Sequence, residues 1–498
     1  MSVRSKVFFA LALALCVLMP GAQSLWIDEA QTWRVASMPS FGAFLSDLTN
    51  THGSEAMMPF GMLMPWLAAR VLGTGEWQLR AVNILWAAAA VGAFFVLGRR
   101  WRMPWAPLFM AVQPFLWFYA NEARPYALQI AAGAWLLVGL VVCVEDRRID
   151  RAGLLILLIS SGILIATVLF GVLTAGPVCL LVAWLAWRGR WPLPKGWRIA
   201  VAVALLWSAL FGAYYLRSVA RGASGARLWD VGMQNITFTF YEFAGFSGLS
   251  LSRNEIRELA QTGGARAILH ACPPLSLAAV AALALAYLTA AVSLLRGAGK
   301  ETRRMVAMIG GPSALSGGAL VLLAFVAHFP FWGRHLAPIF PFFCALLILA
   351  LRDLSARRPA FAAALVTFFF VLLPISSWAL RTSPRHAKDD YRTAVAIARR
   401  AVDEGRIVWW CADPFTARYY GLPITEDRKG EGPAVYVSLM TAEALAGKPP
   451  PDLIIISKPD AFDMGGLVTA YAKERGFLPV QRLNVFAVLA PAPAGGPR

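Results

Sequence analysis

The chain has 498 residues, of which 58% are hydrophobic and only 15% are charged, and it carries a formal net charge of +18 at pH 7. Globular domains contain about 25% charged residues, so this composition excludes an ordinary soluble protein and indicates many membrane-spanning helices. The positive charge does not indicate nucleic-acid binding, because the basic residues gather in short loops between apolar segments, where they set the orientation in the membrane.

The first apolar segment, residues 7–23, is preceded by Arg4 and Lys6. A basic start before a short apolar core is also typical of a secretory signal peptide, for which GAQSLW is a fair cleavage site. Because many more apolar segments follow, we interpret residues 7–23 as a retained first helix, with a cleaved signal peptide as the alternative.

Eleven apolar segments come near the ~20 residues that a membrane-spanning helix needs. They are residues 7–23, 78–98, 104–120, 125–144, 152–170, 172–187, 198–217, 274–296, 306–328, 335–351 and 360–380. With the N-terminus in the cytoplasm, every predicted cytoplasmic loop is basic, as the positive-inside rule requires. The basic residues of these loops are Arg99, Arg100, Arg102, Arg147, Arg148, Arg151, Arg188, Arg190, Lys195, Arg198, Arg296, Lys300, Arg303, Arg304, Arg352, Arg357 and Arg358. The sequence thus predicts about eleven membrane spans in a polytopic α-helical protein.

The same count places residues 24–77, 218–273 and 381–498 on the outer side. The first of these loops contains an apolar stretch, residues 57–73, which Pro59 and Pro65 interrupt. We expect this stretch to form helices that lie in the membrane interface rather than a span. A span here would invert the positive-inside pattern downstream.

The C-terminal part changes in composition at about residue 381. YRTAVAIARRAVDEG has a helical period, whereas RIVWWCA, AVYVSL, DLIIIS and NVFAVLA are typical of strands. We therefore predict two domains, a membrane domain over residues 1–380 and a small extracytoplasmic α/β domain over residues 381–498.

No pair of cysteines has the CxxC spacing of a structural zinc site. Cys272 and Cys411 both fall in predicted outer regions, so they could form a disulfide, although their spacing does not indicate one. His52 could ligate a metal ion with a carboxylate, but a histidine in a loop is more often simply solvated. We assign no metal site, and a divalent metal stays an open alternative.

Two adjacent carboxylates, Asp28 and Glu29, follow directly on the first apolar segment, within SLWIDEAQTWR. A carboxylate at the edge of an apolar wall can act as a general base if a neighbouring group tunes it. Aspartate is also a good helix N-cap, so the pair could instead begin a short helix. The spacing alone does not decide between these interpretations.

The second charged feature is FYANEARPYAL, in the short outer turn before residue 125. Glu122 and Arg124 lie two residues apart among apolar neighbours, where ionisable groups are costly and often mark function. The alternative is an ion pair that ties the turn together, with Tyr119 and Tyr126 as interfacial aromatics.

The third feature is HFPFWGRHLAPIFPFF, residues 328–343, which contains Arg334 and His335. The planar guanidinium is well suited to hold a phosphate, whereas the alternative is an arginine that extends to lipid headgroups. An arginine on the outer side is unusual in a chain that obeys the positive-inside rule. All three features lie on the outer side, so we expect them to converge on one site at the outer membrane face.

These motifs resemble the GT-C glycosyltransferases of the protein O-mannosyltransferase and lipid A aminoarabinose transferase superfamily. The likeness is carried by LWIDEAQT, SEAMMPFGMLMPWLAARVLGTGEWQLRAVN, NEARPYAL and WGRHLAPIFPFF. It covers residues 1–130 well and residues 328–343 fairly, while the remainder matches only in layout. The family commonly has a His-Pro-Pro-Leu-Tyr-like run where this chain reads HGSEAMMPF, so the resemblance gives His52 no role.

The resemblance implies an enzyme that takes a sugar from a polyprenyl-phosphate carrier, which in bacteria would be undecaprenyl phosphate. It implies that Asp28 deprotonates the acceptor hydroxyl with support from Glu29, and that Arg124 and Arg334 hold the carrier phosphate. The further residues expected to bind substrate are Glu55, Glu122, Tyr126 and His335. The enzyme would work at the outer face of the inner membrane, with its C-terminal domain in the periplasm.

Chemistry at the outer face favours the same interpretation, because cytoplasmic nucleotide sugars do not reach that face and a lipid-linked sugar does. The acceptor could be a lipid, a glycan or a protein hydroxyl, and no other cofactor is indicated. The competing interpretation is a transporter or flippase for lipid-linked sugars. Transporters usually place ionisable residues in mid-membrane and contain internal repeats, whereas this chain gathers them at one side and has no evident repeat.

Overall fold

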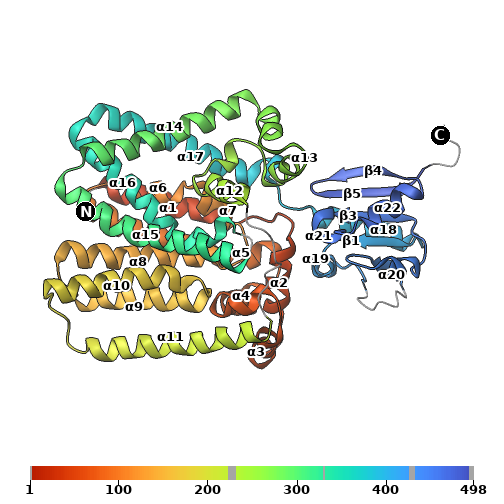
Figure 1. The fold of residues 1–498 in the computed structure, drawn as a ribbon, viewed down its shortest axis with the longest axis horizontal. Helices are drawn as coiled ribbons and strands as arrows, with labels where there is room; N and C mark the ends of the chain where they lie inside the picture. Colours follow the sequence, from red (N-terminus) through yellow and green to blue (C-terminus); the bar gives the residue numbers. More distant parts are fainter. Residues whose placement is uncertain (1–2, 223–231, 329–330, 425–431, 493–498) are drawn as a thin grey trace. The chain divides into compact units, whose positions relative to one another are not determined.

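A computed structural model of the protein describes residues 3–222, 232–328, 331–424 and 432–492 (Figure 1). The chain forms two compact units. The first unit comprises Met1–Gly21 and Val35–His386, and the second comprises Ala22–Arg34 and Ala387–Arg498. The second unit therefore contains a short segment of the predicted first outer loop in addition to the C-terminal part of the chain.

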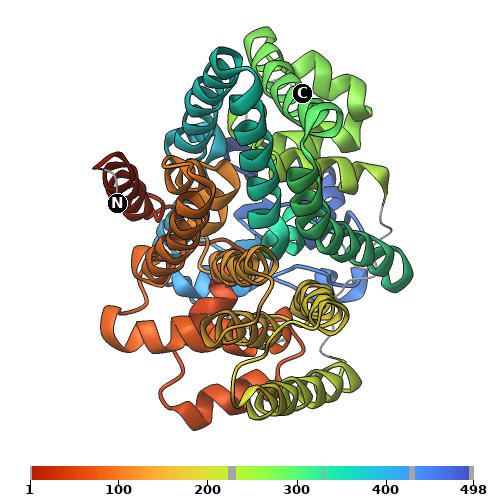
Figure 2. The same cartoon turned by 90° about the vertical axis from the view of Figure 1, so that its left-hand side faces the viewer.

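The first unit is helical, and its long helices run side by side (Figure 2, which looks roughly along their axes). Eight helical segments among the described residues are long and apolar enough to cross a membrane. They are α5 (Glu76–Trp101), α8 (Tyr126–Asp146), α10 (Gly171–Gly189), α11 (Trp197–Ala220), α14 (Pro274–Gly297), α15 (Lys300–Ala327), α16 (Phe340–Arg357) with the preceding 3₁₀ helix η3 (Gly333–Ile339), and α17 (Pro359–Thr382). The predicted polytopic helical membrane protein is confirmed.

The remaining predicted spans form shorter or interrupted helices. The segments at 7–23 and 152–170 become α1 (Val3–Leu18) and α9 (Arg151–Thr167). The segment at 104–120 divides into α6 (Ala106–Ala111) and α7 (Pro114–Ala120). It divides because Pro114 disfavours helical geometry at Gln113, whose backbone is extended.

The first predicted outer loop begins with α2 (Ile27–Ala36), most of which belongs to the second unit, and it contains three further helices in the first unit. They are α3 (Phe41–Asn50), the 3₁₀ helix η1 (Ser54–Met57) and α4 (Pro59–Leu72). With 14 residues, α4 is shorter than the ~20 that a span requires. The predicted outer loop at 218–273 forms α12 (Met233–Phe243), the 3₁₀ helix η2 (Ser247–Leu249) and α13 (Arg253–Ala271).

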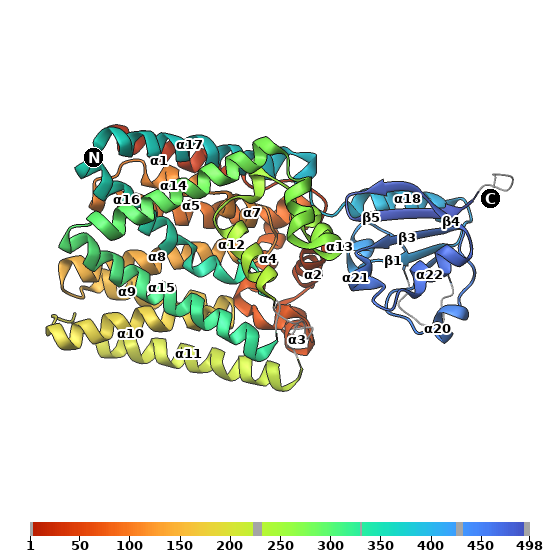
Figure 3. The same cartoon turned by 45° about the horizontal axis from the view of Figure 1, so that its top comes forward.

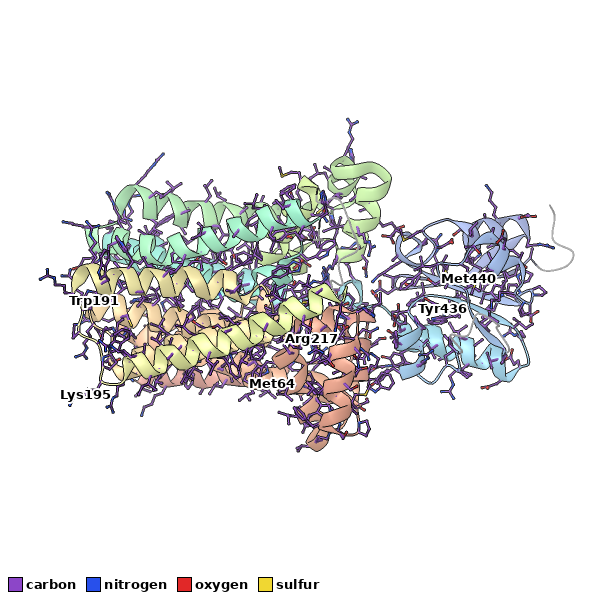
Figure 4. The ribbon with its side chains drawn as sticks, turned by 60° about the horizontal axis from the view of Figure 1, so that its bottom comes forward. Met64, Trp191, Lys195, Arg217, Tyr436 and Met440 are labelled. Carbon is purple, nitrogen blue, oxygen red and sulfur yellow. The ribbon has the colours of Figure 1, made fainter. Side chains whose placement is uncertain are left out.

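Three helices end at an arginine in the left-handed conformation: Arg102 after α5, Arg147 after α8 and Arg190 after α10. A cation at this position complements the partial negative charge of the helix C-terminus. These arginines belong to the basic loops that the sequence assigns to the cytoplasm. Figure 4 shows Lys195, from the loop between α10 and α11, at the opposite end of α11 from Arg217.

The central helix α8 is almost entirely buried and packs closely against η3. A Cβ atom on Gly133 would lie 2.1 Å from the carbonyl oxygen of Pro338, so only glycine allows this approach. A similar contact joins α4 to the turn before α8, where a Cβ on Gly61 would lie 2.6 Å from Pro125. The packing therefore places η3 and α4 near the start of α8.

The second unit contains a five-stranded sheet in the order β2-β1-β3-β5-β4. The strands are β1 (Val408–Cys411), β2 (Ala434–Tyr436), β3 (Leu453–Ser457), β4 (Phe477–Leu483) and β5 (Phe486–Pro491). Strand β1 runs parallel to β2 and β3, whereas β5 runs antiparallel to β3 and β4. The predicted α/β character is confirmed, and β4 is the strand that the sequence did not predict.

Helices of the second unit cover both faces of this sheet. They are α18 (Tyr391–Asp403), α19 (Pro414–Tyr419), α20 (Ala442–Ala446), α21 (Pro459–Phe462) and α22 (Leu467–Glu474). Because successive strand residues point to opposite faces, Trp410 packs in one core with Tyr391 of α18, and Trp409 packs in the other with Val468 of α22.

Candidate active site

The turn before α8 brings Arg124 into contact with the first predicted outer loop. The guanidinium Nη1 lies 3.2 Å from Glu55 Oε1, and both side chains are almost fully buried. Its Nη2 donates a hydrogen bond of 3.0 Å to the hydroxyl of Ser54. The ionic partner of Arg124 in this turn is thus a carboxylate from η1, 69 residues away in sequence. The sequence predicted a role for both residues but not this pairing.

Two buried side chains of α5 bind backbone groups nearby, Asn83 in this turn and Arg80 at Gly21. Asn83 donates hydrogen bonds to the backbone oxygens of Ala120 and Glu122, at 3.1 Å and 2.6 Å. Arg80, which is fully buried, donates a 2.7 Å hydrogen bond to the carbonyl of Gly21. The side chain of Glu122 is itself buried, so its carboxylate lies within the protein just after the end of α7.

A second ionic group, formed by Glu242, Arg253 and Arg334, was not predicted as such from the sequence. Arg253 Nε lies 3.5 Å from Glu242 Oε1, and Arg334 is close enough to interact electrostatically with Glu242. Burial raises the pKa of Glu242, while the two arginines and a hydrogen bond from the Gly333 amide oppose that rise. These charges lie on three elements: α12, α13 and η3.

Aromatic rings surround the cation of this group. The guanidinium carbon of Arg253 lies 5.4 Å from the ring centre of Trp332 and 5.8 Å from those of Phe118 and Phe238. Such contacts stabilise the cation, because the faces of aromatic rings attract positive charge. The side chain keeps 30% of its surface exposed, so Arg253 can bind an anion at its accessible edge.

Three polar atoms next to this group are buried and have no hydrogen-bond partner within the described part of the chain. They are Glu242 Oε2 and the hydroxyls of Tyr119 and Tyr126. A Cβ atom placed on Gly333 would lie 2.8 Å from Glu242 Oε2 and 3.2 Å from the Tyr119 hydroxyl. These two oxygen atoms therefore face the same space beside Gly333. Buried polar groups normally have partners, and this arrangement indicates that water or a ligand completes it.

The structure assigns different surroundings to the other predicted residues. His335 accepts a 3.0 Å hydrogen bond at Nδ1 from the Trp332 amide, and its ring contacts those of Phe170 and Phe331. His52 is exposed, in keeping with the solvated interpretation. Over the described ranges, no three His, Cys, Asp or Glu side chains gather closely enough to hold a metal ion.

The cysteines give no cross-link in the structure. Cys272 and Cys411 are free thiols, like the other four cysteines. Each makes a local contact instead, because Cys272 lies 2.9 Å from the Ser250 hydroxyl and Cys411 lies 3.5 Å from the carbonyl oxygen of Phe462. The disulfide that the sequence left open is therefore not formed here.

Asp28 and Glu29 lie in the second unit, in the first turn of α2. Glu29 is fully buried and its Oε2 lies 2.9 Å from Lys388 Nζ. Asp28 is close enough to Asp413 to raise the pKa of that carboxyl through like-charge repulsion, after the larger effect of burial. The position in a helical first turn agrees with the helix-start interpretation of the pair. Its predicted convergence with Arg124 and Arg334 stays a prediction.

No family model matches the chain, and no curated protein matches it. Among solved structures it is similar to ArnT from Cupriavidus metallidurans bound to undecaprenyl phosphate, with 15% identity, 99% of both chains covered and a TM-score of 0.49. The apo state of the same protein gives 16% identity and a TM-score of 0.45, with the same coverage. Arabinofuranosyltransferase AftD from mycobacteria gives 14% identity and a TM-score of 0.44, with 99% of this chain and 40% of AftD covered. At this distance the likeness assigns no activity, so the proposal below depends on this chain's own residues.

Sequence reasoning missed Glu242, Arg253 and Lys388. Glu242 carries a signal that could have been used, because it is the single acidic residue of the apolar, aromatic segment NITFTFYEFAGF and such a residue marks function by default. Arg253 and Lys388 carry no such signal. Each lies in a stretch with several other charged residues. Only the folded structure shows which of these residues is paired with a buried carboxylate.

Proposed function

We propose that the protein is an inverting GT-C-type glycosyltransferase. It moves a sugar from a polyprenyl-phosphate carrier to an acceptor hydroxyl at the outer face of the membrane. The proposal combines the sequence resemblance with the ionic groups of the first unit. The observation that carries it is the pair of arginines, Arg124 and Arg253, each held by a buried carboxylate at the ends of helices.

Burying an ion pair rarely improves stability, because removing both charges from water costs about as much as their attraction returns. The chain nevertheless places Arg124 with Glu55 and Arg253 with Glu242. Helices α12 and α13 carry Glu242 and Arg253, and helices α4 and α7 adjoin η1 and the turn that contains Arg124. All four helices lie at the same end of the first unit (Figure 3). A function at that end accounts for their presence better than stability does.

The reaction follows from the charges that develop in it. The acceptor oxygen forms a bond to the anomeric carbon, the bond from that carbon to the phosphate oxygen breaks, and the phosphate leaves with the electron pair. Arginines stabilise the leaving phosphate as its charge grows, a role we give to Arg124, Arg253 and Arg334. Asp28 takes the proton of the acceptor hydroxyl. A single displacement inverts the anomeric centre.

The unpartnered polar atoms have a role in the same proposal. Glu242 Oε2 and the Tyr119 hydroxyl would bind hydroxyl groups of the transferred sugar, with Glu122 and Tyr126 beside them. We further propose that the carrier is undecaprenyl phosphate and that the enzyme lies in a bacterial inner membrane. Its acceptor is then a lipid, glycan or protein on the periplasmic side.

The test compares wild type with Asp28→Asn in isolated membranes supplied with radiolabelled polyprenyl-phosphate sugars. We expect label to leave the carrier with wild type and transfer to fall at least ~100-fold in the variant, the lower range for loss of a general base. Equal loss of label from both proteins would remove Asp28 from the mechanism. If no carrier loses label while both proteins are folded, the transport of lipid-linked sugars across proteoliposomes becomes the next measurement.

A further inference from the structure

The segment Ala22–Arg34 is bound to the C-terminal part of the second unit along its backbone. The amide of Leu25 donates a 2.7 Å hydrogen bond to the hydroxyl of Tyr420. Arg392 donates from its backbone amide to the Ser24 hydroxyl at 3.2 Å, and from its guanidinium to the carbonyl of Ala22 at 2.7 Å. Three residues shortly before Asp28, namely Ala22, Ser24 and Leu25, are thus held by residues more than 360 positions later.

Apolar and aromatic contacts continue this attachment on both sides of Asp28. Ile27 packs against the hydrophobic cores on both faces of the sheet. The ring of Trp33 meets the ring of Tyr419 edge-on, with 5.3 Å between their centres, and Lys458 Nζ lies 5.8 Å from the ring centre of Trp26. Asp28 is therefore flanked by anchored residues before and after it.

The strongest single contact is the ion pair of Glu29 with Lys388. The distance is 2.9 Å, Glu29 is fully buried and the Lys388 side chain is only 10% exposed. The same carboxylate accepts a 3.4 Å hydrogen bond from the Trp26 amide, which closes the first turn of α2. Loss of one partner would leave the other charge buried and uncompensated, so the pair fixes the orientation of this turn.

The segment Ala22–Arg34 is attached at the edge of the sheet where the parallel strands β1 and β3 have their carboxyl ends. Asp413 follows β1 by two residues, and Lys458 follows β3 directly. In open α/β sheets the space beyond the carboxyl ends of parallel strands is where a ligand usually binds. Here Lys458 and Asp413 face the segment that carries Asp28. The sheet thus holds a piece of its own chain at this edge.

We infer that the second unit is the support that positions Asp28, and that Lys388 is a positioning residue acting through Glu29. The inference rests on the proposed function, in which Asp28 takes the acceptor proton. It gives the C-terminal domain a defined task in the reaction: the carboxyl edge of its sheet fixes the segment that contains the base. Tyr420 has the same task through the Leu25 amide.

The test uses the full-length protein with Lys388→Gln, Lys388→Arg and the surface control Lys473→Gln. Hydrogen exchange reports whether residues 22–34 stay ordered, and transfer kinetics report kcat and KM for the labelled carrier. We expect Lys388→Gln to speed exchange in residues 22–34 while the amides of β1 stay protected. Its kcat should fall roughly 100-fold with KM nearly unchanged, since displacement of a catalytic group by about 1 Å has that effect.

The control variants separate positioning from general damage. Lys388→Arg keeps the charge and should restore most of kcat, and Lys473→Gln should match wild type. If Lys388→Gln fails to fold, Tyr420→Phe serves instead, because it removes one hydroxyl and keeps the ring. The inference is overturned if the folded variant keeps wild-type exchange in residues 22–34, or if kcat stays within about threefold of wild type despite faster exchange.

Failure of the proposed function would look different. In that case wild type itself would release no sugar from any carrier, whereas the exchange measurement would still report whether Lys388 orders the segment. If Asp28→Asn abolishes transfer and Lys388→Gln does not impair it, the proposed glycosyltransferase function is supported and the positioning role of Lys388 is refuted.

Discussion

The first unit contains two ion pairs whose burial adds little to stability. Arg124 with Glu55 and Arg253 with Glu242 are both placed among apolar and aromatic neighbours. An apolar pair of similar volume would often be as stable or more stable at such positions. The two pairs nevertheless differ in exposure, since Arg253 keeps an accessible edge and Arg124 does not. Arg124 should therefore show the larger effect on folding.

We expect Arg124→Met to lower the free energy of unfolding by about 3–5 kcal/mol, because it leaves the Glu55 carboxylate buried without its partner. The double variant Arg124→Met/Glu55→Met should regain most of that loss, while transfer activity stays low in both. Thermal unfolding in detergent, followed alongside the carrier assay, measures both quantities. Equal stability of the single and double variants would contradict this account of the pair.

Asp413 makes the stability of the second unit depend on pH. Burial raises its pKa from 3.8 to about 6, with hydrogen bonds from Thr416 opposing the rise and Asp28 adding to it. A raised pKa means that the folded state holds the proton more tightly, so the stabilisation is complete below about pH 4 and is lost as the pH rises through 6. The loss amounts to roughly 3 kcal/mol, from about 1.4 kcal/mol per pKa unit.

We therefore expect the protection of the β1 amides against hydrogen exchange to fall between pH 4 and pH 7 in wild type, after correction for intrinsic rates. Asp413→Asn can still cap α19 and should show a flatter profile. Parallel profiles for the two proteins would mean that another group titrates in this range.

For single residues, the sequence singles out a charge that interrupts an apolar run. Glu122, Arg124 and Arg334 stand out for that reason, and Glu242 would have done so under the same rule. Lys388 could not be found, because its partner Glu29 is some 360 residues earlier and nothing local relates them. Burial and pairing over such separations are properties of the fold.

Helix lengths follow from composition, whereas interruptions depend on single residues. The long segments that became α5, α8, α14 and α17 have continuous apolar sequences, so their number and order could be predicted. The division of the 104–120 segment depends on Pro114, and β4 escaped prediction because its residues are largely exposed and include Pro479. An exposed edge strand lacks the apolar alternation that sequence reasoning uses.

The start of η3 depends on one glycine. A Cβ on Gly333 would lie 2.8 Å from Glu242 Oε2 and 3.2 Å from the Tyr119 hydroxyl, so Gly333→Ala should push these groups apart. We expect transfer activity to fall at least ~10-fold while the protein still inserts in membranes, since small displacements at a reacting site have large effects. The matched control is Gly176→Ala in α10, where no atom lies within 4 Å of the added carbon. Comparable losses in both variants would mean that helix packing in general is the cause.

At the scale of the whole molecule, the distribution of basic residues predicts the orientation that the proposal needs. Lys195 lies in a basic loop and Lys473 in the second unit, so the two should face opposite sides of the membrane. The K473C variant should react with a membrane-impermeant thiol reagent in intact cells, and the K195C variant only after permeabilisation. Wild type gives the background from the six native cysteines. Reaction of K195C in intact cells would reverse the topology and remove the extracytoplasmic site.

The second unit is assembled from two pieces of chain, residues 22–34 and 387–498, that leave the ribosome at very different times. The segment with Asp28 is synthesised among the first residues, yet Lys388, Arg392 and Tyr420 are added only in the last quarter of the chain. Contacts so distant in sequence form late, because the chain between them must first be made and closed. During biosynthesis the proposed base, Asp28, would then be fixed in position last, after the membrane helices have been inserted. A prematurely terminated chain would occupy the membrane without catalysing transfer.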